Sequence, residues 1–579
     1  MKPNHRTPHT ASRTLRTACL IILLILNSPF SILHCSAQSP NCYRITFSDK
    51  NNSPYSIERP EEYLSPRAIA KRERFNIAVT EQDLPVNPQY IEAILNFSTE
   101  PAQIISTSKW NNSVVIFYPE TENCHDIINE MITQLPFVVD TLPVAYYQLP
   151  FITGKSIQKQ MPEPRKSIVY SSSSCDYDYG KSIVNIRLHK GEFLHKAGFC
   201  GEGMLICAFD SNWSGLDTLS YFKPLYDNGQ MWGTRDLIPG VGNVYIANDD
   251  NFAGHGTSCF SDMASCIEGT LVGTAPQANY FLMRTENPWG ENLVEEDFWA
   301  QGAEIADSLG ADVISSSVGY KYFDYEWQNI YTSDDNDGKA SIASRAASIL
   351  AHKGVIVVQG AGNEGNTEWH YIGRPADAFD ILAVGNVSVS GYISYTSSYG
   401  PSADGRIKPD VAAAGGGWCV WRGQIREFTA EQGGCSGATP KIAGLAACLW
   451  QALPQYSALE IMDFIRKHGN RSQNPDDRTG YGIPDFYQCY LDHHIGVSES
   501  VMPEFSVYPN PTAGELQITN YELQITNIEV FDVFGRAVLS HTAHHIPHTA
   551  INISHLPAGI YILKVVANEH IYTHKIVKI

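Results

Sequence analysis

The sequence predicts an α/β protein built on a doubly wound parallel sheet, preceded by an α+β domain and followed by a small C-terminal β-sandwich. Three observations lead to this prediction. Over residues 183–492, continuous apolar runs alternate with helical patterns, which is typical of a parallel sheet covered on both faces. Residues 38–145 mix strand-like runs with a polar helical stretch. Residues 504–579 form short segments separated by glycine and proline, which is typical of a β-sandwich.

The composition is that of a globular protein that is rich in acids. The chain has 579 residues, of which 43% are hydrophobic and 18% are charged, and its formal net charge is −20. Its length allows roughly three to four domains of about 150 residues each. Because an acidic surface repels phosphate backbones, we expect no nucleic-acid partner. We also expect no transmembrane segment, because no apolar run is long enough to span a bilayer.

The first residues predict a secretory signal peptide over residues 1–37. Basic residues precede the apolar run Ala18–Leu26, and a small-residue cleavage site follows at Ala37. Cys35 suggests a lipoprotein as an alternative, although His34 stands where such signals carry a small residue. In both cases we expect the protein to leave the cytoplasm.

Two folded segments and two linkers are expected around the central domain. Residues 38–145 predict a domain with a helix around Ser65–Phe75 and a strand at Ser113–Phe117. Residues 146–182 predict a linker, because they contain prolines and a serine run and lack a hydrophobic period. A second linker is expected at 493–503, before the C-terminal domain.

The central segment predicts strands and helices in alternation. A parallel sheet of this kind places its chemistry at the carboxyl ends of the strands. Asp210 and the turn Gly360–Asn363 both follow predicted strands, so we expect them at this edge. The expected strands are Met204–Phe209, Ala311–Ser317, Gly354–Val358 and Ile381–Val384, and the expected helices are Glu295–Leu309, Ile342–His352 and Ala438–Leu453.

Three short sequences contain residue types that catalysis uses. An acid ends a predicted strand, a histidine lies between two glycines, and a serine opens a predicted helix. Each alone has a plain structural explanation, because such residues also end strands, form turns and cap helices. The sequences are Ala208-Phe209-Asp210-Ser211, Gly254-His255-Gly256-Thr257 and Gly434-Cys435-Ser436-Gly437-Ala438-Thr439-Pro440.

In the chain order Asp, His, Ser, these sequences resemble the subtilase family of serine proteases. Further matches follow in the family's order, and this order makes the resemblance specific where any one motif is weak. They are Gly273 to Pro276, Ala311 to Gly319, Gly360 to Gly365, Ser397 to Pro401 and Asp404 to Asp410.

The resemblance implies a subtilisin-like serine endopeptidase with Asp210, His255 and Ser436 as its catalytic triad. It implies that Asn363 donates a hydrogen bond to the oxyanion, and that no organic cofactor is needed. It allows a structural calcium ion without indicating the ligands. The substrate-binding residues that it implies are Ser315, Ser317, Val318, Gly319, Gly360, Ala361 and Gly362.

The residue types suit this chemistry. A serine hydroxyl is a weak nucleophile until a base takes its proton, and His255 would be that base. Asp210 would hold the imidazole in one tautomer and stabilise its charged form. We expect the glycines beside His255 and Ser436 to let a substrate backbone come close. We expect Pro440 in the first turn of the helix that follows.

Alternatives remain for the nucleophile and for the activity. Cys435 stands where the family usually has threonine, and it is a second candidate nucleophile, although the register against Ala438-Thr439-Pro440 favours Ser436. A catalytically silent binding protein or adhesin is the alternative from another functional class. A processing protease for one dedicated surface partner would share the chemistry and differ in substrate range.

The flanking segments resemble two known domain types. Leu64–Ala68, Asp83–Val86 and Ser108–Asn111 resemble the pro-domain of secreted subtilases, with an ordinary accessory domain as the alternative. Tyr508–Thr512 and Leu556–Tyr561 resemble the C-terminal sorting domain of type IX secretion, with a binding module as the alternative. The resemblance implies protein or peptide substrates, the type IX machinery as a partner, and export through the periplasm to a secreted or cell-surface location.

Cysteines and acidic turns give no predicted metal site. The chain has 13 cysteines, none in a C-x-x-C pair, so we predict no zinc site and leave disulfide pairing open. Asp334–Gly338 resembles a calcium loop, but Ser333 and Ser344 would occupy positions that an EF-hand fills with acids. We interpret this segment as a solvated acidic turn.

Overall fold

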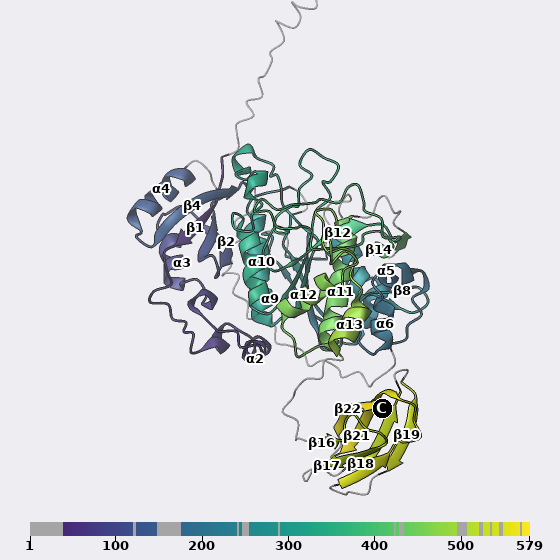
Figure 1. The fold of residues 1–579 in the computed structure, drawn as a ribbon. Coiled ribbons are helices and arrows are strands. Elements are labelled where there is room, and N and C mark those ends of the chain that lie inside the picture. The colour runs from purple at the N-terminus through teal and green to yellow at the C-terminus, as the bar shows by residue number, and fades with distance from the viewer. Residues whose placement is uncertain are drawn as a thin grey trace, which may run out of the picture. The chain divides into compact units, whose positions relative to one another are not determined.

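The computed structural model divides the chain into two compact units at His494, and each is described by itself (Figure 1). The predicted signal peptide lies outside the described residues. In the described part of the chain, no helix combines the length and the apolar character that a bilayer crossing needs. The structure describes residues 39–119, 123–147, 175–239, 242–245, 254–287, 290–421, 424–427, 434–494, 506–519, 525–532, 535–542, 548–567 and 570–579.

The core of the first unit is a seven-stranded sheet in which every neighbouring pair is parallel, which confirms the predicted α/β class. The strand order is β13-β12-β11-β10-β5-β9-β6, so β9 and β10 lie on opposite sides of β5. This reversal opens a crevice at the carboxyl ends of the strands. The strands are β5 (Leu205–Asp210), β6 (Met231–Asp236), β9 (Asn279–Arg284), β10 (Val313–Ser316), β11 (Ile356–Gly360), β12 (Leu382–Val387) and β13 (Val411–Ala414).

Helices cover both faces of this sheet. Helices α9 and α10 pack against each other, and in Figure 1 they stand between the N-terminal sheet and the large sheet. Helix α11 packs against α8 and crosses five of the strands, and its many alanines let it lie buried on almost every side. The helices are α5 (Ile183–Arg187), α6 (Gly191–Lys196), α7 (Lys223–Asp227), α8 (His255–Ala264), α9 (Glu295–Leu309), α10 (Ile342–His352), α11 (Cys435–Ala452), α12 (Ala458–Lys467) and α13 (Phe486–His494).

The N-terminal domain has a four-stranded antiparallel sheet in the order β2-β3-β1-β4. Alternate residues of its strands face α3 and α4, so that Ile45, Ile116 and Met131 are buried in one cluster. The predicted strand at Ser113–Phe117 is present with the same bounds. The elements are β1 (Cys42–Phe47), α2 (Pro66–Arg74), α3 (Pro88–Leu95), β2 (Gln103–Ser108), β3 (Ser113–Phe117), α4 (Cys124–Gln134) and β4 (Val138–Ala145).

Buried polar contacts hold this domain against α9. Arg44 of β1 bonds both carboxylate oxygens of Asp297, at 2.7 and 2.6 Å, and both side chains are buried. Two turns further along α9, Glu304 accepts the backbone N–H groups of Lys109 and Trp110 at 2.8 and 3.0 Å. Because these groups are shielded from water, each depends on its partner across the interface.

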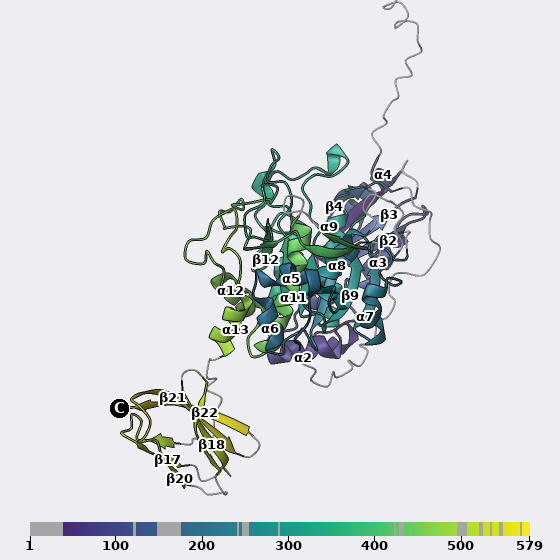
Figure 2. The same cartoon turned by 90° about the vertical axis from the view of Figure 1, so that its right-hand side faces the viewer.

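Helix α2 makes a separate contact, at the amino-terminal edge of the large sheet. Arg72 pairs with Asp307 at 2.8 Å, and Lys71 pairs with Asp312, the residue before β10, at 3.1 Å. Figure 2 shows α2 at this edge, apart from the N-terminal sheet. The domain is therefore held against the rest of the first unit at two places.

Removing Arg44 tests how much its contact with Asp297 contributes to the stability of the fold. Arg44→Ala leaves the buried carboxylate of Asp297 without its partner, so we expect the free energy of unfolding to fall by about 3–5 kcal/mol. Arg59→Ala is the matched control, because the pair of Arg59 with Glu62 is exposed and should contribute less than about 1 kcal/mol. Chemical unfolding of the full chain measures both, and equal losses in the two variants would contradict the prediction.

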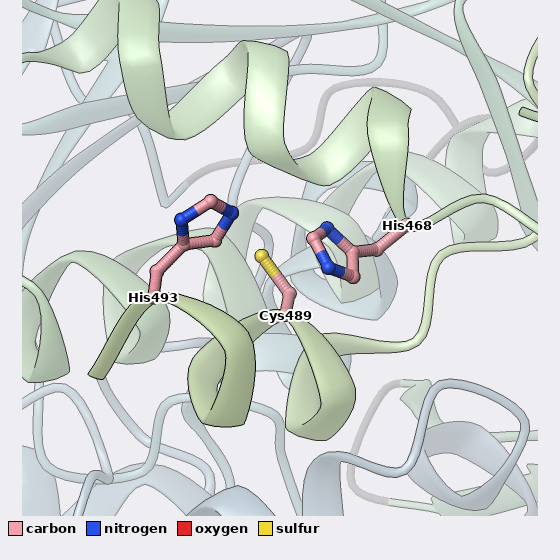
Figure 3. Close-up of side chains that lie close together, drawn as sticks. All are labelled: His468, Cys489 and His493. Atoms are coloured by element: carbon pink, nitrogen blue, oxygen red, sulfur yellow. The ribbon is translucent and has the colours of Figure 1, made fainter. Parts of the chain in front are cut away.

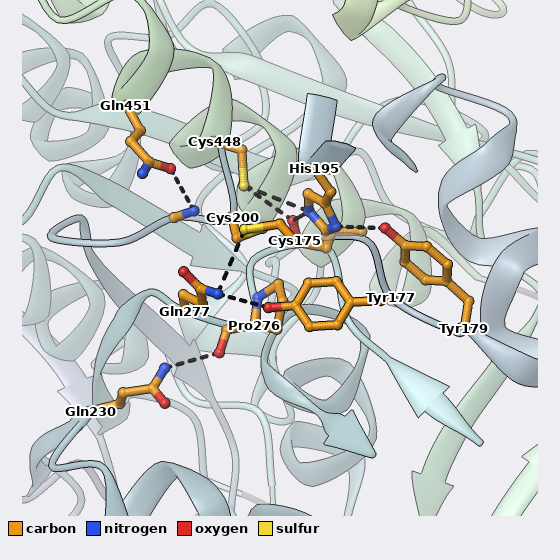
Figure 4. Close-up of a disulfide and its surroundings, with 12 residues drawn as sticks. Cys175, Tyr177, Tyr179, His195, Cys200, Gln230, Pro276, Gln277, Cys448 and Gln451 are labelled. Carbon is orange, nitrogen blue, oxygen red and sulfur yellow. Dashed lines mark hydrogen bonds between the residues drawn. A yellow bond between two sulfur atoms is a disulfide. The ribbon is translucent and has the colours of Figure 1, made fainter. Parts of the chain in front are cut away.

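A disulfide between Cys175 and Cys200 joins the residues before α5 to the loop before β5 (Figure 4). Four residues after Cys175, the hydroxyl of Tyr179 lies 2.7 Å from Nδ1 of the buried His195. The end of the predicted linker 146–182 therefore differs from the prediction. From Cys175 onward the residues are not a free connection, because the disulfide and the contact of Tyr179 hold them in the folded unit. Most of that predicted linker lies outside the described residues.

The second unit contains two antiparallel sheets that share one hydrophobic core, as predicted for a β-sandwich. Leu516 and Ile518 of one sheet and Ile528 and Leu563 of the other are fully buried in that core. One sheet is formed by β16 (Ser506–Tyr508), β17 (Glu515–Thr519) and β20 (His548–Asn552), and the other by β18 (Ile525–Phe531), β19 (Ala537–Thr542), β21 (Gly559–Ala567) and β22 (His570–Lys578).

Candidate active site

Asp210 and His255 meet at the carboxyl edge of the large sheet. Asp210 ends β5 and its side chain is buried, while His255 is the first residue of α8. Nδ1 of His255 lies 2.8 and 3.0 Å from the two carboxylate oxygens of Asp210. The His255 side chain remains 32% exposed, so the other side of the ring is open to a reactant.

The carboxylate determines the charge state of the imidazole. Burial is the largest effect and lowers the pKa of His255, but attraction to Asp210, the contact with Cys259 and the hydrogen bonds to both together outweigh it and hold the pKa well above its ordinary value. A backbone N–H from Ser211 at 2.8 Å holds one oxygen of Asp210 in place. The pair is therefore arranged to accept and stabilise a proton on His255.

Cys259 is a residue of this site that the sequence did not indicate. It lies one turn after His255 on α8, and its sulfur is 4.0 Å from both ring nitrogens. Burial raises the pKa of this thiol, which keeps it neutral beside the ring. The i, i+4 spacing on a helix is the signal that would have revealed the contact.

The glycines beside the histidine and the serine have a role different from the expected one. Gly254 has a φ of 104°, which favours glycine. A Cβ on Gly256 would lie 2.2 Å from the carbonyl oxygen of Asn212, and one on Gly437 would lie 2.3 Å from that of Gly415. These glycines therefore make room for the protein's own backbone, which lets α8 and α11 approach the loops that complete the site.

Ser436 lies in the first turn of α11, which begins three residues earlier than predicted, at Cys435. Pro440 is consequently inside the helix and not in its first turn. A proline has no N–H to bond the carbonyl oxygen of the residue four positions earlier, which is Ser436. The hydroxyl of Ser317 donates to that oxygen at 3.1 Å and so connects the end of β10 to the turn that carries Ser436.

The side chains of Cys435 and Asn363 are fixed beside this turn. The Cys435 thiol donates to the carbonyl of Gly362 at 3.0 Å, and burial raises its pKa to about 11. The side-chain oxygen of Asn363 accepts the N–H of Cys435 at 2.9 Å, which makes the NH₂ group the outward donor of this exposed side chain. The thiol is thus engaged inward, whereas Ser436 is only half-buried.

The residues expected to bind substrate divide into two groups. Those that reach the surface can present backbone or hydroxyl groups to a ligand, and they are Ser317, Gly319, Gly360 and Gly362. The others have side chains packed inside the protein, so only their backbone groups are suited to contact a substrate. These are Ser315, Val318 and Ala361, with exposed fractions of 4%, 3% and 0%.

Among the described residues, three groups of side chains have the spacing of metal ligands. One is Asp210 with His255 and Cys259, and another lies at the ends of α12 and α13. The third consists of Glu286, Glu291 and Glu295. In it, the two oxygens of Glu295 already accept backbone N–H groups from the loop before α9, at 2.9 and 3.2 Å, which explains it as a loop cap.

Three family profiles match successive parts of the chain. The subtilase family matches residues 203–482, the Peptidase S8 propeptide domain of Bacteroidota matches residues 42–161, and the secretion system C-terminal sorting domain matches residues 506–579. The propeptide match extends into the segment that the sequence predicts as a linker.

Curated relatives resemble the middle of the chain. Serine protease AprX of Bacillus subtilis (strain 168) is 26% identical over 294 residues, which cover 46% of this chain and 62% of AprX. M-protease of Shouchella clausii (strain KSM-K16) is 24% identical over 294 residues, 51% of this chain and 63% of that protein. Thermitase of Thermoactinomyces vulgaris is 30% identical over 235 residues, 39% of this chain and 73% of thermitase. The chain thus spans just under two thirds of AprX and of M-protease.

Proposed function

This chain belongs to the subtilase family, and on that premise we propose that it is a serine endopeptidase that cleaves peptide bonds through an acyl-enzyme on Ser436. The observation that carries the proposal is the contact of His255 with the buried Asp210, at the sheet edge where the helix of Ser436 begins. A base held in this way, and a half-buried serine in the first turn of a helix that begins at the same sheet edge, suit nucleophilic catalysis.

The reaction proceeds in two halves. His255 takes the hydroxyl proton of Ser436 as the oxygen attacks the substrate carbonyl carbon, and Asp210 stabilises the imidazolium. The oxyanion accepts hydrogen bonds from the Asn363 amide and from the backbone N–H of Ser436. His255 then gives its proton to the leaving amine, which breaks the peptide bond. A water molecule, deprotonated by His255, releases the acyl group in the second half.

The pro-domain role of the N-terminal domain is part of the proposal. Its buried contacts with α9, through Arg44 and through the two N–H groups bound by Glu304, would hold it on the enzyme even after a cut in the linker. Such a domain would help the sheet to fold and would delay activity until it is removed. We propose the type IX machinery as the partner of residues 506–579, whose match to a sorting domain indicates export to a secreted or surface-associated location.

Reactivity toward a serine-directed reagent tests the activity. We expect the purified chain, once its N-terminal domain has been removed, to hydrolyse casein and to be labelled by a fluorophosphonate that abolishes the hydrolysis. The full chain before removal is the control and should react more slowly. If the chain shows no hydrolysis and no labelling, even with added calcium, the result would support a silent binding protein instead.

The oxyanion role of Asn363 predicts a loss in kcat and not in KM. Asn363→Ala should lower kcat by about 100- to 1000-fold, the range known for the same kind of donor in subtilisin. Asn363→Asp is the sharper variant, because it keeps an oxygen to accept the N–H of Cys435 and removes the NH₂ donor. Steady-state kinetics on a peptide substrate measures both. Full activity in Asn363→Asp would exclude a donor role.

A further inference from the structure

Two histidines and a cysteine converge where the first unit ends. His468 is the residue that follows α12, and Cys489 and His493 lie one turn apart on α13. Their candidate ligand atoms all lie within 4.8 Å of one another. Figure 3 shows the Cys489 sulfur between the two imidazole rings. This cluster is separate from the triad, and the proposed function does not use it.

The hydrogen bonds of His468 prepare one nitrogen as a ligand. Nδ1 lies 2.8 Å from the carbonyl oxygen of Phe464, so its N–H donates there and the lone pair is left on Nε2. That Nε2 faces a carboxylate oxygen of Asp492 at 3.0 Å. Two acceptor atoms at this distance require a positive charge shared between them, which a proton or a metal ion can supply.

The other histidine has a nitrogen that needs a partner. Nε2 of His493 is buried and has no hydrogen-bond partner among the described residues. The ring is stacked on Phe464 with centroids 3.5 Å apart, and this contact fixes its orientation. A buried polar atom without a partner is costly, and an ion bound by the ring is one way to satisfy it.

We propose that His468, Cys489 and His493 form a binding site for a divalent ion of the Zn²⁺ type, with Asp492 beside it as the partner of His468. One thiolate and two imidazoles supply three of the four ligands of tetrahedral Zn²⁺, at metal–ligand distances of about 2.0–2.3 Å, and a water molecule supplies the fourth. Such distances place ligand atoms about 3.3–3.7 Å apart, so the three atoms, which lie within 4.8 Å of one another, must approach by at most about 1.5 Å on binding. The thiol proton leaves to solvent as the ion binds.

The proposed ion would join α12 to α13, the last helix before the C-terminal domain. Asp492 is 52% exposed, which gives the ion a path from solvent. No sequence pattern predicted the site, because 20 residues separate His468 from Cys489. The packing of α12 against α13 brings them together. The bound ion would therefore hold α13, the last helix of the first unit, against the end of α12.

Metal binding by the untagged full chain carrying Ser436→Ala tests the proposal without dependence on activity. We expect one equivalent of Zn²⁺ in competition with a chromophoric chelator, and a thiolate-to-metal absorption band when Co²⁺ replaces it. Cys489→Ser and His493→Gln should each weaken binding by at least about 100-fold, since loss of an outer-shell partner alone costs about 10- to 100-fold. Both variants should unfold at the wild-type temperature without metal, and only the parent should gain thermal stability with it.

Two control variants separate this site from other thiols. Cys448→Ser removes a buried thiol that contacts a single imidazole, that of His195, and should leave binding unchanged. Cys259→Ser removes the thiol beside the triad and should also leave it unchanged. If Cys489→Ser misfolds, His493→Gln alone decides. Absence of stoichiometric binding, binding that survives His493→Gln, or binding lost only with Cys259→Ser would overturn the proposal.

Discussion

Replacing Ser436 with alanine is expected to lower kcat by about 10⁶-fold, which is the loss known for the nucleophile of subtilisin. Without the hydroxyl no acyl-enzyme forms, and only binding and the oxyanion donors remain to accelerate hydrolysis. The measurement is kcat on a chromogenic peptide, together with fluorophosphonate labelling. Labelling should disappear with the activity, because the reagent modifies the same oxygen.

Cys435→Ala is the matched control for the nucleophile. Its thiol donates to the carbonyl of Gly362 and is held protonated by burial, so it is poorly placed to attack a substrate. We expect Cys435→Ala to retain kcat within about tenfold, with any change arising from the shape of the neighbouring groove. Loss of activity in Cys435→Ala with retention in Ser436→Ala would make the cysteine the nucleophile.

Asp210→Asn is expected to lower kcat by about 10⁴-fold, the magnitude known for this change in a serine protease of another fold. The amide keeps the size of the carboxylate but removes the charge that stabilises the imidazolium of His255, and it favours the wrong tautomer. Ser211→Ala is the matched control, because it removes a neighbouring hydroxyl 3.3 Å from the carboxylate and leaves the charge. It should retain activity within about tenfold.

The pH profile distinguishes this role from simple damage. His255 must be neutral to act as a base, and its pKa is raised, so activity should be present above that pKa and lost as pH falls through it. Asp210→Asn removes the charge that raises this pKa, so the acidic limb of kcat/KM should move to lower pH. An unchanged acidic limb would show that Asp210 does not determine the protonation of His255.

The sequence was sufficient for the main architecture because each strand of a buried parallel sheet is itself apolar. The helices Glu295–Leu309 and Ile342–His352 have the bounds that their period predicts. The strands ending at Asp210 and Gly360 begin and end one or two residues later than predicted, because the hydrogen-bonded strand continues past the last apolar residue of the run. The start of α11 was missed, since a proline inside a helix resembles a helix start.

Local sequence did not reveal why the glycines are needed. Gly256 and Gly437 were expected to admit substrate, yet each faces a carbonyl oxygen of the protein. The same limit applies to Cys259, whose contact with His255 depends on the helix that begins there. A motif states which residue types are present, whereas the neighbours that constrain them come from other segments.

The sequence by itself determined the order of the domains, the α/β class and the residues of the candidate triad, because these depend on local periodicity and on short motifs. Only the tertiary structure decided the pairing of Cys175 with Cys200, the buried ion pair of Arg44 with Asp297, and the approach of His468 to Cys489. Each of these joins side chains from segments with no shared local pattern. Their meeting depends on how packed helices and strands close around one core, which is a property of the whole chain.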